Sequence, residues 1–189
     1  MEIYLIRHGQ TDANSKAIIQ GRVDNPLNAT GKAQAKRTAE YLKQYSLKFD
    51  YCVASPLSRA IETMHIIKEQ LHIDLPTHIE PDIIEREFGE LDGKPIPQNY
   101  FQVVHQGLAK GMETDQAIEQ RVRTFFYRFF QEHQHERVLM VAHSHVIKAL
   151  LVQYIDDFSY DAYLNNCSIN RLTFNQDIQI IDYNIDPLK

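Results

Sequence analysis

The feature that most constrains the fold is a pair of short runs with high β propensity, residues 2–6 and 138–142, each followed within two positions by a histidine. The second run has no polar position, which is typical of a strand that is buried on both faces. The first run stops at Arg7, and Gly9 permits the backbone angles of a turn directly after His8. The pattern therefore predicts a helix-covered parallel sheet that presents reactive side chains where two of its strands end.

Between and after these runs, strand signals alternate with helical signals. Thr30 is a plausible N-cap for one helix, and Ser55 with Pro56 predicts the start of another directly after a strand at residues 51–54. Residues 12–29 are rich in turn formers and are predicted as a loop. The remaining predicted elements are a strand at 77–79, helices at 115–133 and 146–154, and strands at 168–174 and 179–183. This order predicts an α/β fold, a three-layer α/β/α sandwich with a mostly parallel central sheet and a C-terminal hairpin.

The length of 189 residues favours one domain over residues 1–189 with a single substantial core. Residues 94–114 fit no regular element and contain two prolines and two glycines. We expect this segment to be a lid or an insertion that covers a substrate pocket.

Composition excludes several classes of function. Twenty basic and twenty-five acidic residues give a formal charge of −5 without a basic tail, so nucleic acid is not an expected partner. The N-terminal residues lack an export signal, and residues 146–155 are interrupted by polar side chains, so neither a membrane span nor a membrane partner is expected. Cys52 and Cys167 are expected to be free thiols, which suits a cytoplasmic protein. The sequence does not indicate an oligomeric state.

Four side chains form a candidate anion site. Arg7 with His8 and, separately, His143 come at the ends of predicted core strands, where open α/β sheets bind ligands. Arg59 falls in the first turn of a predicted helix, an end that favours anions. Guanidinium groups match phosphate oxygens in pairs, and a neutral histidine can carry a phosphoryl group covalently. A carboxyl group would then serve as acid and base, and the nearby candidates are Glu85, Glu87, Glu90 and Asp92.

Further residues, in chain order, make the sequence recognisable. The segments are Arg7-His8-Gly9-Gln10-Thr11 with Asn14, Gln20-Gly21-Arg22 with Pro26-Leu27, Gly31 with Gln34-Ala35, Ser55 to Ala60 with Glu62-Thr63, Glu85 with Phe88-Gly89 and Gly93, and His143 with Val146-Ile147 and Ala149 to Leu151. This pattern resembles the histidine phosphatase superfamily, also described as the phosphoglycerate-mutase-like family. The resemblance runs from residue 3 to about residue 152 and leaves the 94–114 segment and the C-terminal hairpin unmatched.

The resemblance implies a role for each matched position. His8 corresponds to the phosphorylated histidine and Glu85 to the proton donor. The groups that would hold the phosphoryl oxygens are Arg7, Arg59, His143, Asn14 and the backbone N–H of Ser144. Gln20 and Gly21 fall where the family contacts the rest of the substrate. The chain departs from the family at Ser144-His145, where small residues are common, so His145 is a candidate substrate contact.

The predicted function is a metal-independent phosphomonoesterase that acts on a small phosphorylated substrate through phosphohistidine, with no cofactor and no metal site. Phosphoglycerate-mutase-type phosphoryl transfer is less favoured because the interval between Glu85 and His143 is short. Two other classes stay open at this stage. Paired histidines, His133 with His135 and His143 with His145, would suit a metallohydrolase. A non-catalytic module that binds phosphorylated ligands would keep the same anion site.

Overall fold

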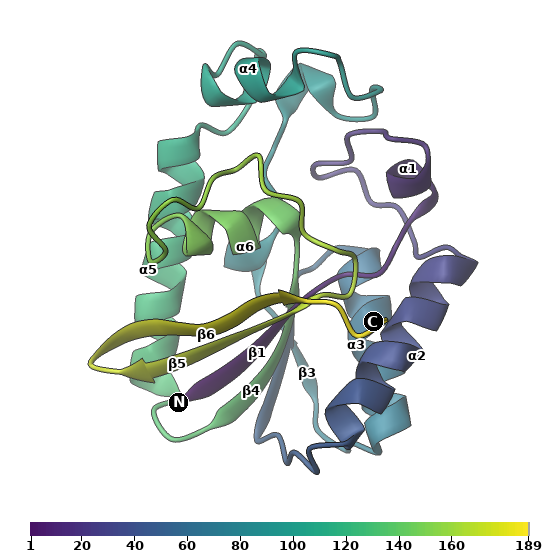
Figure 1. Cartoon of the computed structure of the whole chain (residues 1–189), viewed down its shortest axis with the longest axis vertical. Coiled ribbons are helices and arrows are strands. Elements are labelled where there is room, and N and C mark those ends of the chain that lie inside the picture. Colours follow the sequence, from purple (N-terminus) through teal and green to yellow (C-terminus); the bar gives the residue numbers. More distant parts are fainter. Residues whose placement is uncertain (189) are drawn as a thin grey trace.

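A computed structural model of the chain describes residues 1–188 and is built around one six-stranded sheet (Figure 1). The strands are β1 (Glu2–Arg7), β2 (Tyr51–Ala54), β3 (Thr77–Ile79), β4 (Arg137–Ala142), β5 (Ile169–Asn175) and β6 (Asp177–Ile185). Their spatial order is β3-β2-β4-β1-β5-β6. The first four are parallel, whereas β5 runs antiparallel to β1 and forms a hairpin with β6. The predicted sheet and C-terminal hairpin are confirmed.

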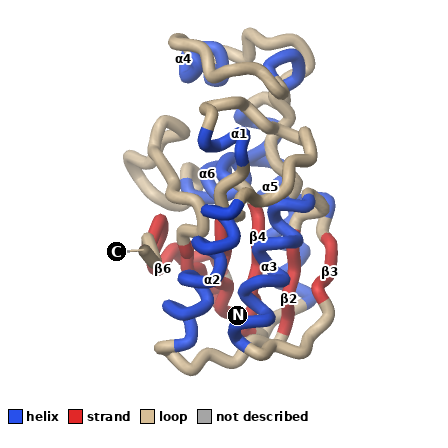
Figure 2. The backbone as a smooth tube through the Cα atoms, turned by 90° about the vertical axis from the view of Figure 1, so that its right-hand side faces the viewer, coloured by secondary structure: helices blue, strands red, loops and turns tan. Residues whose placement is uncertain are grey.

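Helices cover both faces of this sheet. The helices within residues 1–188 are α1 (Asp12–Ser15), α2 (Ala29–Lys43), α3 (Ser58–Leu71), α4 (Tyr100–His105), α5 (Asp115–Glu132) and α6 (Ser144–Leu151), with short 3₁₀ helices at Pro81–Ile83 and Gly89–Leu91. Helices α2 and α3 lie on one face, and α5 and α6 lie on the other (Figures 1 and 2). The three-layer α/β/α arrangement is therefore confirmed.

The wholly apolar strand β4 shows why both faces need a helical layer. Val138, Met140 and Ala142 pack into the core under α5 and α6. The alternate residues Leu139 and Val141 pack into the core under α2 and α3. Because successive side chains of a strand point to opposite faces, a strand with no polar position must be buried on both sides.

The strand register brings the two histidines together. Arg7 at the end of β1 pairs with Ala142 at the end of β4, so the next residues, His8 and His143, are neighbours at the same edge. The His8 backbone N–H continues the ladder by donating to the Ala142 carbonyl at 3.0 Å. On the other side of β4, the Ser55 N–H donates to the Val141 carbonyl at 3.0 Å. Three polar side chains thus meet at the carboxyl edge of the parallel strands.

Three local predictions were wrong. The predicted loop at 12–29 contains α1, where Thr11 and Asn14 cap the helix by exchanging side-chain-to-backbone bonds. Helix α2 begins at Ala29 with Asn28 as N-cap rather than Thr30, because the Asn28 side chain accepts the Gly31 N–H at 2.8 Å. Helix α3 begins at Ser58, so Ser55 does not cap it.

The 94–114 segment lies above the carboxyl edge of the sheet and contains α4 (Figures 1 and 2). Its backbone is tied to the loop after α1, where the Lys94 carbonyl accepts the Ile19 N–H at 2.9 Å. Beneath it is a small separate core in which Ile19, Phe88 and Val104 are buried. Within residues 1–188, no helix has the length and apolar character needed to cross a membrane.

Candidate active site

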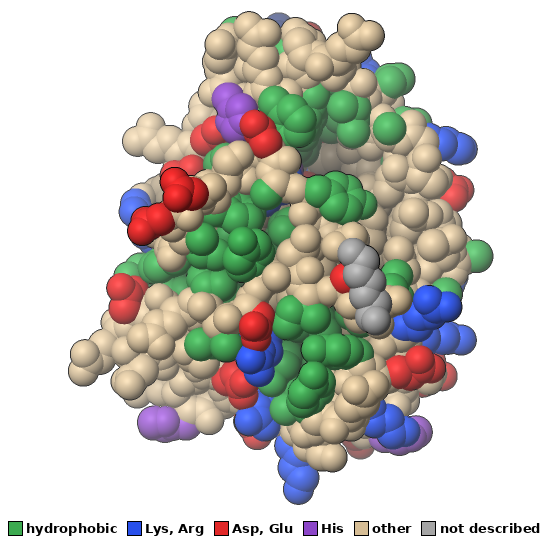
Figure 3. All heavy atoms as spheres, in the orientation of Figure 1, with side chains coloured by type: hydrophobic (Ala, Val, Ile, Leu, Met, Phe, Trp, Pro, Cys, Tyr) green, Lys and Arg blue, Asp and Glu red, His purple; other side chains and the backbone are tan. Residues whose placement is uncertain are grey.

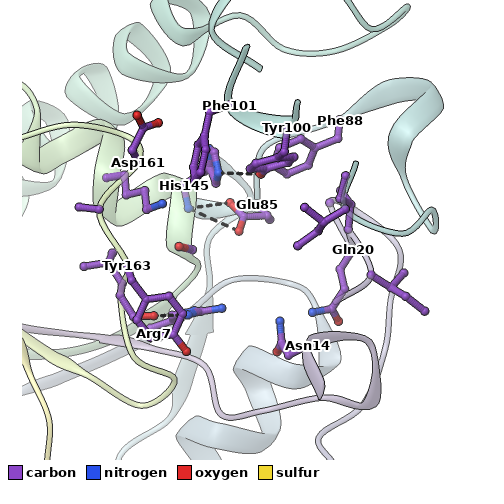
Figure 4. A pocket seen from close by; sticks show the side chains of 18 of the residues that line it. Arg7, Asn14, Gln20, Glu85, Phe88, Tyr100, Phe101, His145, Asp161 and Tyr163 are labelled. Atoms are coloured by element: carbon purple, nitrogen blue, oxygen red, sulfur yellow. Dashed lines mark hydrogen bonds between the residues drawn. The ribbon is translucent and has the colours of Figure 1, made fainter. Parts of the chain in front are cut away.

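A pocket of about 510 Å³ opens at the carboxyl edge of the sheet, between α6 and the 94–114 segment. Figure 3 shows the surface hollowed below the part formed by α4, with hydrophobic side chains around the hollow. Figure 4 shows Glu85, Asn14 and Gln20 facing the same space. The predicted site residues that line the pocket are Arg7, His8, Asn14, Gln20, Gly21, Arg59, Glu85, Ser144 and His145.

His8 is buried at the end of β1 with its tautomer fixed by the backbone. Its Nδ1 lies 2.7 Å from the Gly9 carbonyl oxygen, which can only accept, so Nδ1 carries the proton. The lone pair is then on Nε2. Burial lowers the pKa of His8 well below its usual value, and the charges of Arg59 and Arg7 lower it further. The imidazole is therefore neutral and nucleophilic at neutral pH.

His143 lies beside His8, with 5.1 Å between the ring centroids. Its Nε2 is 2.6 Å from the Ser55 hydroxyl oxygen, which also accepts the Leu57 N–H at 3.4 Å. The hydroxyl can then donate its own proton to Nε2, which leaves the ring proton on Nδ1. That Nδ1 is buried and has no hydrogen-bond partner among residues 1–188. Burial, followed by Arg59, lowers the pKa of His143 well below its usual value.

Arg7 and Arg59 are buried cations held by carbonyl groups. Arg7 donates to the Leu164 carbonyl, and Arg59 donates to the Val23 and Gly21 carbonyls at 2.8 Å each. Both Nε groups are buried, and neither has a hydrogen-bond partner in the part of the chain that the structure describes. Burial lowers the pKa of Arg59 to about 10, so it stays charged at neutral pH. Two cations with unsatisfied donors form an anion site.

Asn14 and Gln20 are oriented by polar contacts at their oxygen atoms. Asn14 Oδ1 accepts from the Thr11 N–H at 3.1 Å, and Gln20 Oε1 accepts from the Thr11 hydroxyl at 2.8 Å. Because the oxygens are occupied, the amide NH₂ groups are the free ends, and Figure 4 shows both amides at the pocket. Gly21 contributes its backbone, and a Cβ there would lie 1.9 Å from a carboxylate oxygen of Asp92.

Glu85 is the buried carboxyl group of the pocket. Its Oε1 accepts the Arg86 N–H at 2.9 Å and the His145 N–H at 3.2 Å, whereas Oε2 is 3.5 Å from the His145 nitrogen. Burial raises the pKa of Glu85 above its usual value, despite these bonds and the nearby arginines. Because Oε2 makes only the longer contact, we expect the proton of the acid form to lie on Oε2.

The other carboxyl candidates lie elsewhere. Glu87 is half exposed and pairs with Arg22 at 2.9 Å. Glu90 accepts the Lys110 N–H at 3.1 Å, and Asp92 accepts the Arg22 N–H at 3.4 Å. Only Glu85 of the four lines the pocket.

His145 joins α6 to the 94–114 segment. Its Nε2 lies 3.3 Å from the Tyr100 hydroxyl, and its ring makes an edge contact with Phe88 at 5.0 Å. Burial lowers its pKa well below the usual value, and its Nδ1 is buried without a partner. Ser144 is the first residue of α6, where backbone N–H groups face outward.

Several supporting residues were not singled out from the sequence for these roles. The sequence predicted Ser55 as a helix cap, whereas in the structure its hydroxyl bonds His143 Nε2. Asn166 holds the His8 carbonyl at 3.0 Å. Arg121 donates to the carbonyls of Asp82 and Ile84, in the segment that leads to Glu85. Each contact joins segments that are far apart in the chain, so no local pattern marks it. Ser55 carries a partial signal, because it follows a buried strand as His8 and His143 do.

The paired histidines do not build a metal centre. Across residues 1–188, no three His, Cys, Asp or Glu side chains converge as metal ligands. His133 instead bonds Glu136 at 2.7 Å, at the opposite end of β4 from His143. Both Cys52 and Cys167 are buried free thiols, as expected.

Several curated relatives that are similar in sequence are phosphatases or phosphoglycerate mutases by name. An uncharacterised phosphatase, PhoE, from Bacillus subtilis is 36% identical over 187 residues, which span 97% of this chain and 94% of that protein. A broad-specificity phosphatase from Saccharomyces cerevisiae is 28% identical over 191 residues, which span 97% of this chain and 80% of that protein.

Solved structures agree in fold. A phosphoglycerate mutase from Bacillus anthracis superposes with a TM-score of 0.88 at 20% identity, covering 98% of this chain and 93% of that one. A putative alpha-ribazole-5'-P phosphatase from Escherichia coli gives a TM-score of 0.81 at 26% identity, covering 98% and 97% of the two chains. The sequence profile of the histidine phosphatase superfamily (branch 1) matches residues 3–186. The chain therefore belongs to branch 1 of the histidine phosphatase superfamily.

Proposed function

We propose that the protein is a metal-independent phosphomonoesterase that hydrolyses a small phosphate ester through a phosphohistidine intermediate. The observation that carries the proposal is the contact of His8 Nδ1 with the Gly9 carbonyl oxygen, which assigns the lone pair to Nε2 in a buried cationic pocket. Arg7 and Arg59 supply that charge, and each has an Nε without a partner.

In the first step, His8 Nε2 attacks the phosphorus atom and the bond from phosphorus to the leaving oxygen breaks. The free donors of Arg7, Arg59 and Asn14, together with His143 Nδ1 and the Ser144 N–H, stabilise the charge on the phosphoryl oxygens. The leaving oxygen takes the proton of Glu85, whose raised pKa keeps the acid form available. The products of this step are the alcohol and phosphohistidine.

In the second step, water attacks the phosphohistidine. Glu85, now a carboxylate, removes a proton from the water as the new oxygen–phosphorus bond forms and the nitrogen–phosphorus bond breaks. Inorganic phosphate leaves, His8 returns to its neutral form, and Glu85 is again protonated. One carboxyl group thus acts as acid and then as base.

The substrate beyond its phosphate would be bound by Gln20, Gly21 and the 94–114 segment, which we propose as a lid or pocket insertion within a single domain over residues 1–189. His145 is proposed to support this wall, because its ring contacts Tyr100 and its backbone N–H holds Glu85. We favour simple hydrolysis over mutase-type phosphoryl transfer because the interval between Glu85 and His143, which contains the 94–114 segment, is short. The phosphatase names of the two curated relatives agree with hydrolysis.

The proposal is tested with purified protein and an aryl phosphate. We expect release of the phenol and inorganic phosphate, unchanged after dialysis against a metal chelator. Loss of turnover in chelator with recovery on adding a divalent ion would favour a metallohydrolase. Tight phosphate binding without turnover at any pH would favour a binding module.

A Ser55→Ala variant tests the role of His143. Without the hydroxyl, His143 Nε2 loses its partner and the ring is free to take the other tautomer, so kcat for the aryl phosphate is expected to fall about ten-fold, the effect of one hydrogen bond. Ser46→Ala, at an exposed position beyond α2, is the matched control. Equal rates for both variants would contradict an orienting role for Ser55.

A further inference from the structure

Lys148 is a buried cation of the pocket that the proposed reaction does not use. It lies on α6, it is 7% exposed, and its ammonium donates to the Tyr160 carbonyl at 2.6 Å. An ammonium group has three donors, and this is its one hydrogen bond within residues 1–188. A buried ammonium with spare donors and no carboxylate partner is costly unless a ligand completes it.

The helix places Lys148 beside the phosphate site. Ser144 and Lys148 both line the pocket, and residues four apart lie on the same face of a helix. At 1.5 Å per residue, Lys148 is displaced about 6 Å along α6 from the phosphate-binding end. A group bound by Lys148 would therefore belong to the part of the substrate beyond its phosphate.

The charges around the pocket leave Lys148 uncompensated. Asp161 follows Tyr160 in the chain and lines the pocket. Its carboxylate lies 2.8 Å from His105 Nε2, and His105 Nδ1 lies 3.2 Å from the carboxylate of Asp115. Carboxylates only accept, so both ring nitrogens of His105 carry protons, and the imidazolium offsets the Asp161 charge. Asp115 is paired separately with Arg86 at 2.6 Å.

In the proposed cycle, which begins with Glu85 in its acid form, the pocket is left with the charges of Arg7, Arg59 and Lys148. A phosphate ester brings about two negative charges. One positive charge is left over, and it lies away from the phosphorus atom.

We propose, on the basis of the phosphatase function above, that Lys148 binds a second anionic group on the leaving-group side of the substrate. The substrate class is thus a phosphomonoester that also carries a carboxylate or a second phosphate. Lys148 is a specificity-determining residue, and a neutral alcohol in the leaving group would leave its ammonium unsatisfied.

The groups that face Lys148 set the pH range of this contact. The pKa of Lys148 is lowered to about 8, mainly by burial and then by Arg7, while Asp161, and Glu85 in its carboxylate form, act in the opposite direction. His145, on the same helix, is kept neutral by its own lowered pKa. Lys148 is therefore charged below about pH 8 and loses its charge as the pH rises through that value, so affinity for the second anion is expected to fall there.

The test is a series of three-carbon alkyl phosphates whose far end is a hydroxyl, a carboxylate or a second phosphate. Dissociation constants are measured by calorimetry on a His8→Ala background, so that turnover does not interfere. We expect Lys148→Met to weaken the two anionic probes by about ten-fold or more, the effect of a lost charged hydrogen bond, and to change the hydroxyl probe little. Comparing the dissociation constants of the carboxylate and bisphosphate probes identifies which anion Lys148 prefers.

Lys148→Arg keeps the charge and is expected to retain the preference without the weakening near pH 8, because arginine stays protonated. Equal affinities of the Lys148→Met variant and its parent for the anionic probes, or equal losses on all three probes, would overturn the proposal. Thermal unfolding of each variant checks that the fold is kept. Failure of the phosphatase function itself would appear separately, as absent turnover of every ester by the native protein.

Discussion

A His8→Ala variant is expected to lose at least about four orders of magnitude in kcat toward an aryl phosphate, because the bond-forming nitrogen is removed. The other phosphate donors remain, so the variant should still bind inorganic phosphate. The measurement is the initial rate of phenol release at saturating substrate. Quenching the native enzyme into alkali during turnover should trap a phosphoramidate, which alkali preserves and acid destroys.

His135→Ala is the matched control, since His135 is exposed and lies beyond the end of α5, away from the pocket. It should retain native rates. Turnover that persists in His8→Ala, or a trapped phosphoryl group that survives acid as a serine ester would, would exclude His8 as the nucleophile.

A Glu85→Gln variant is expected to slow hydrolysis of an alkyl phosphate by about 10²–10⁴-fold, the usual contribution of general acid catalysis. The amide oxygen can still accept the Arg86 and His145 N–H groups, so the local structure should be kept. A nitrophenyl ester needs little protonation of its leaving group and should lose far less in the phosphorylation step. Single-turnover rates on both esters measure that step.

Glu87→Gln is the matched control, because Glu87 is half exposed and does not line the pocket. Losses of equal size on alkyl and nitrophenyl esters would remove Glu85 from the acid role.

The pH profile provides a second check on Glu85. Its pKa is raised by burial, so the acid form is present below that pKa and is lost as the pH rises through it. Native activity on the alkyl ester should therefore fall on the alkaline side, and Glu85→Gln should flatten this limb. The lowered pKa of His8 keeps the nucleophile neutral well below the usual range, which moves the acid limb to lower pH.

Much of the fold could be predicted because the residue composition of a strand indicates whether one or both of its faces are buried. A run such as 138–142 can be satisfied only between two helical layers, and both layers are present. Helix starts were less predictable, because several residues near a start can cap it. Asn28 and Thr30 are both suitable caps, and the structure uses Asn28, whose own backbone N–H is held by the distant Gln10 carbonyl at 3.0 Å.

Some residues of the candidate site could likewise be predicted from the sequence, and others could not. The residues that resemble a known family were found from the sequence and meet around one pocket or at its edge. Ser55 and Lys148 were not assigned a site role, because what they do depends on which side chain lies opposite. In the sequence, Lys148 interrupts an apolar helix, and only the packed structure shows that it faces a pocket with one carbonyl partner.

The strand order has a consequence for how the protein is made. Strand β1 precedes the other five strands in the chain, yet its two neighbours in the sheet are β4, near residue 140, and β5, which begins at Ile169. The His8 carbonyl is also held by the side chain of Asn166. Long-range pairing of this kind is slow to form because a long loop must close first. Chains in which β4 and β5 are not yet made therefore hold His8, the proposed nucleophile, without the strands that position it.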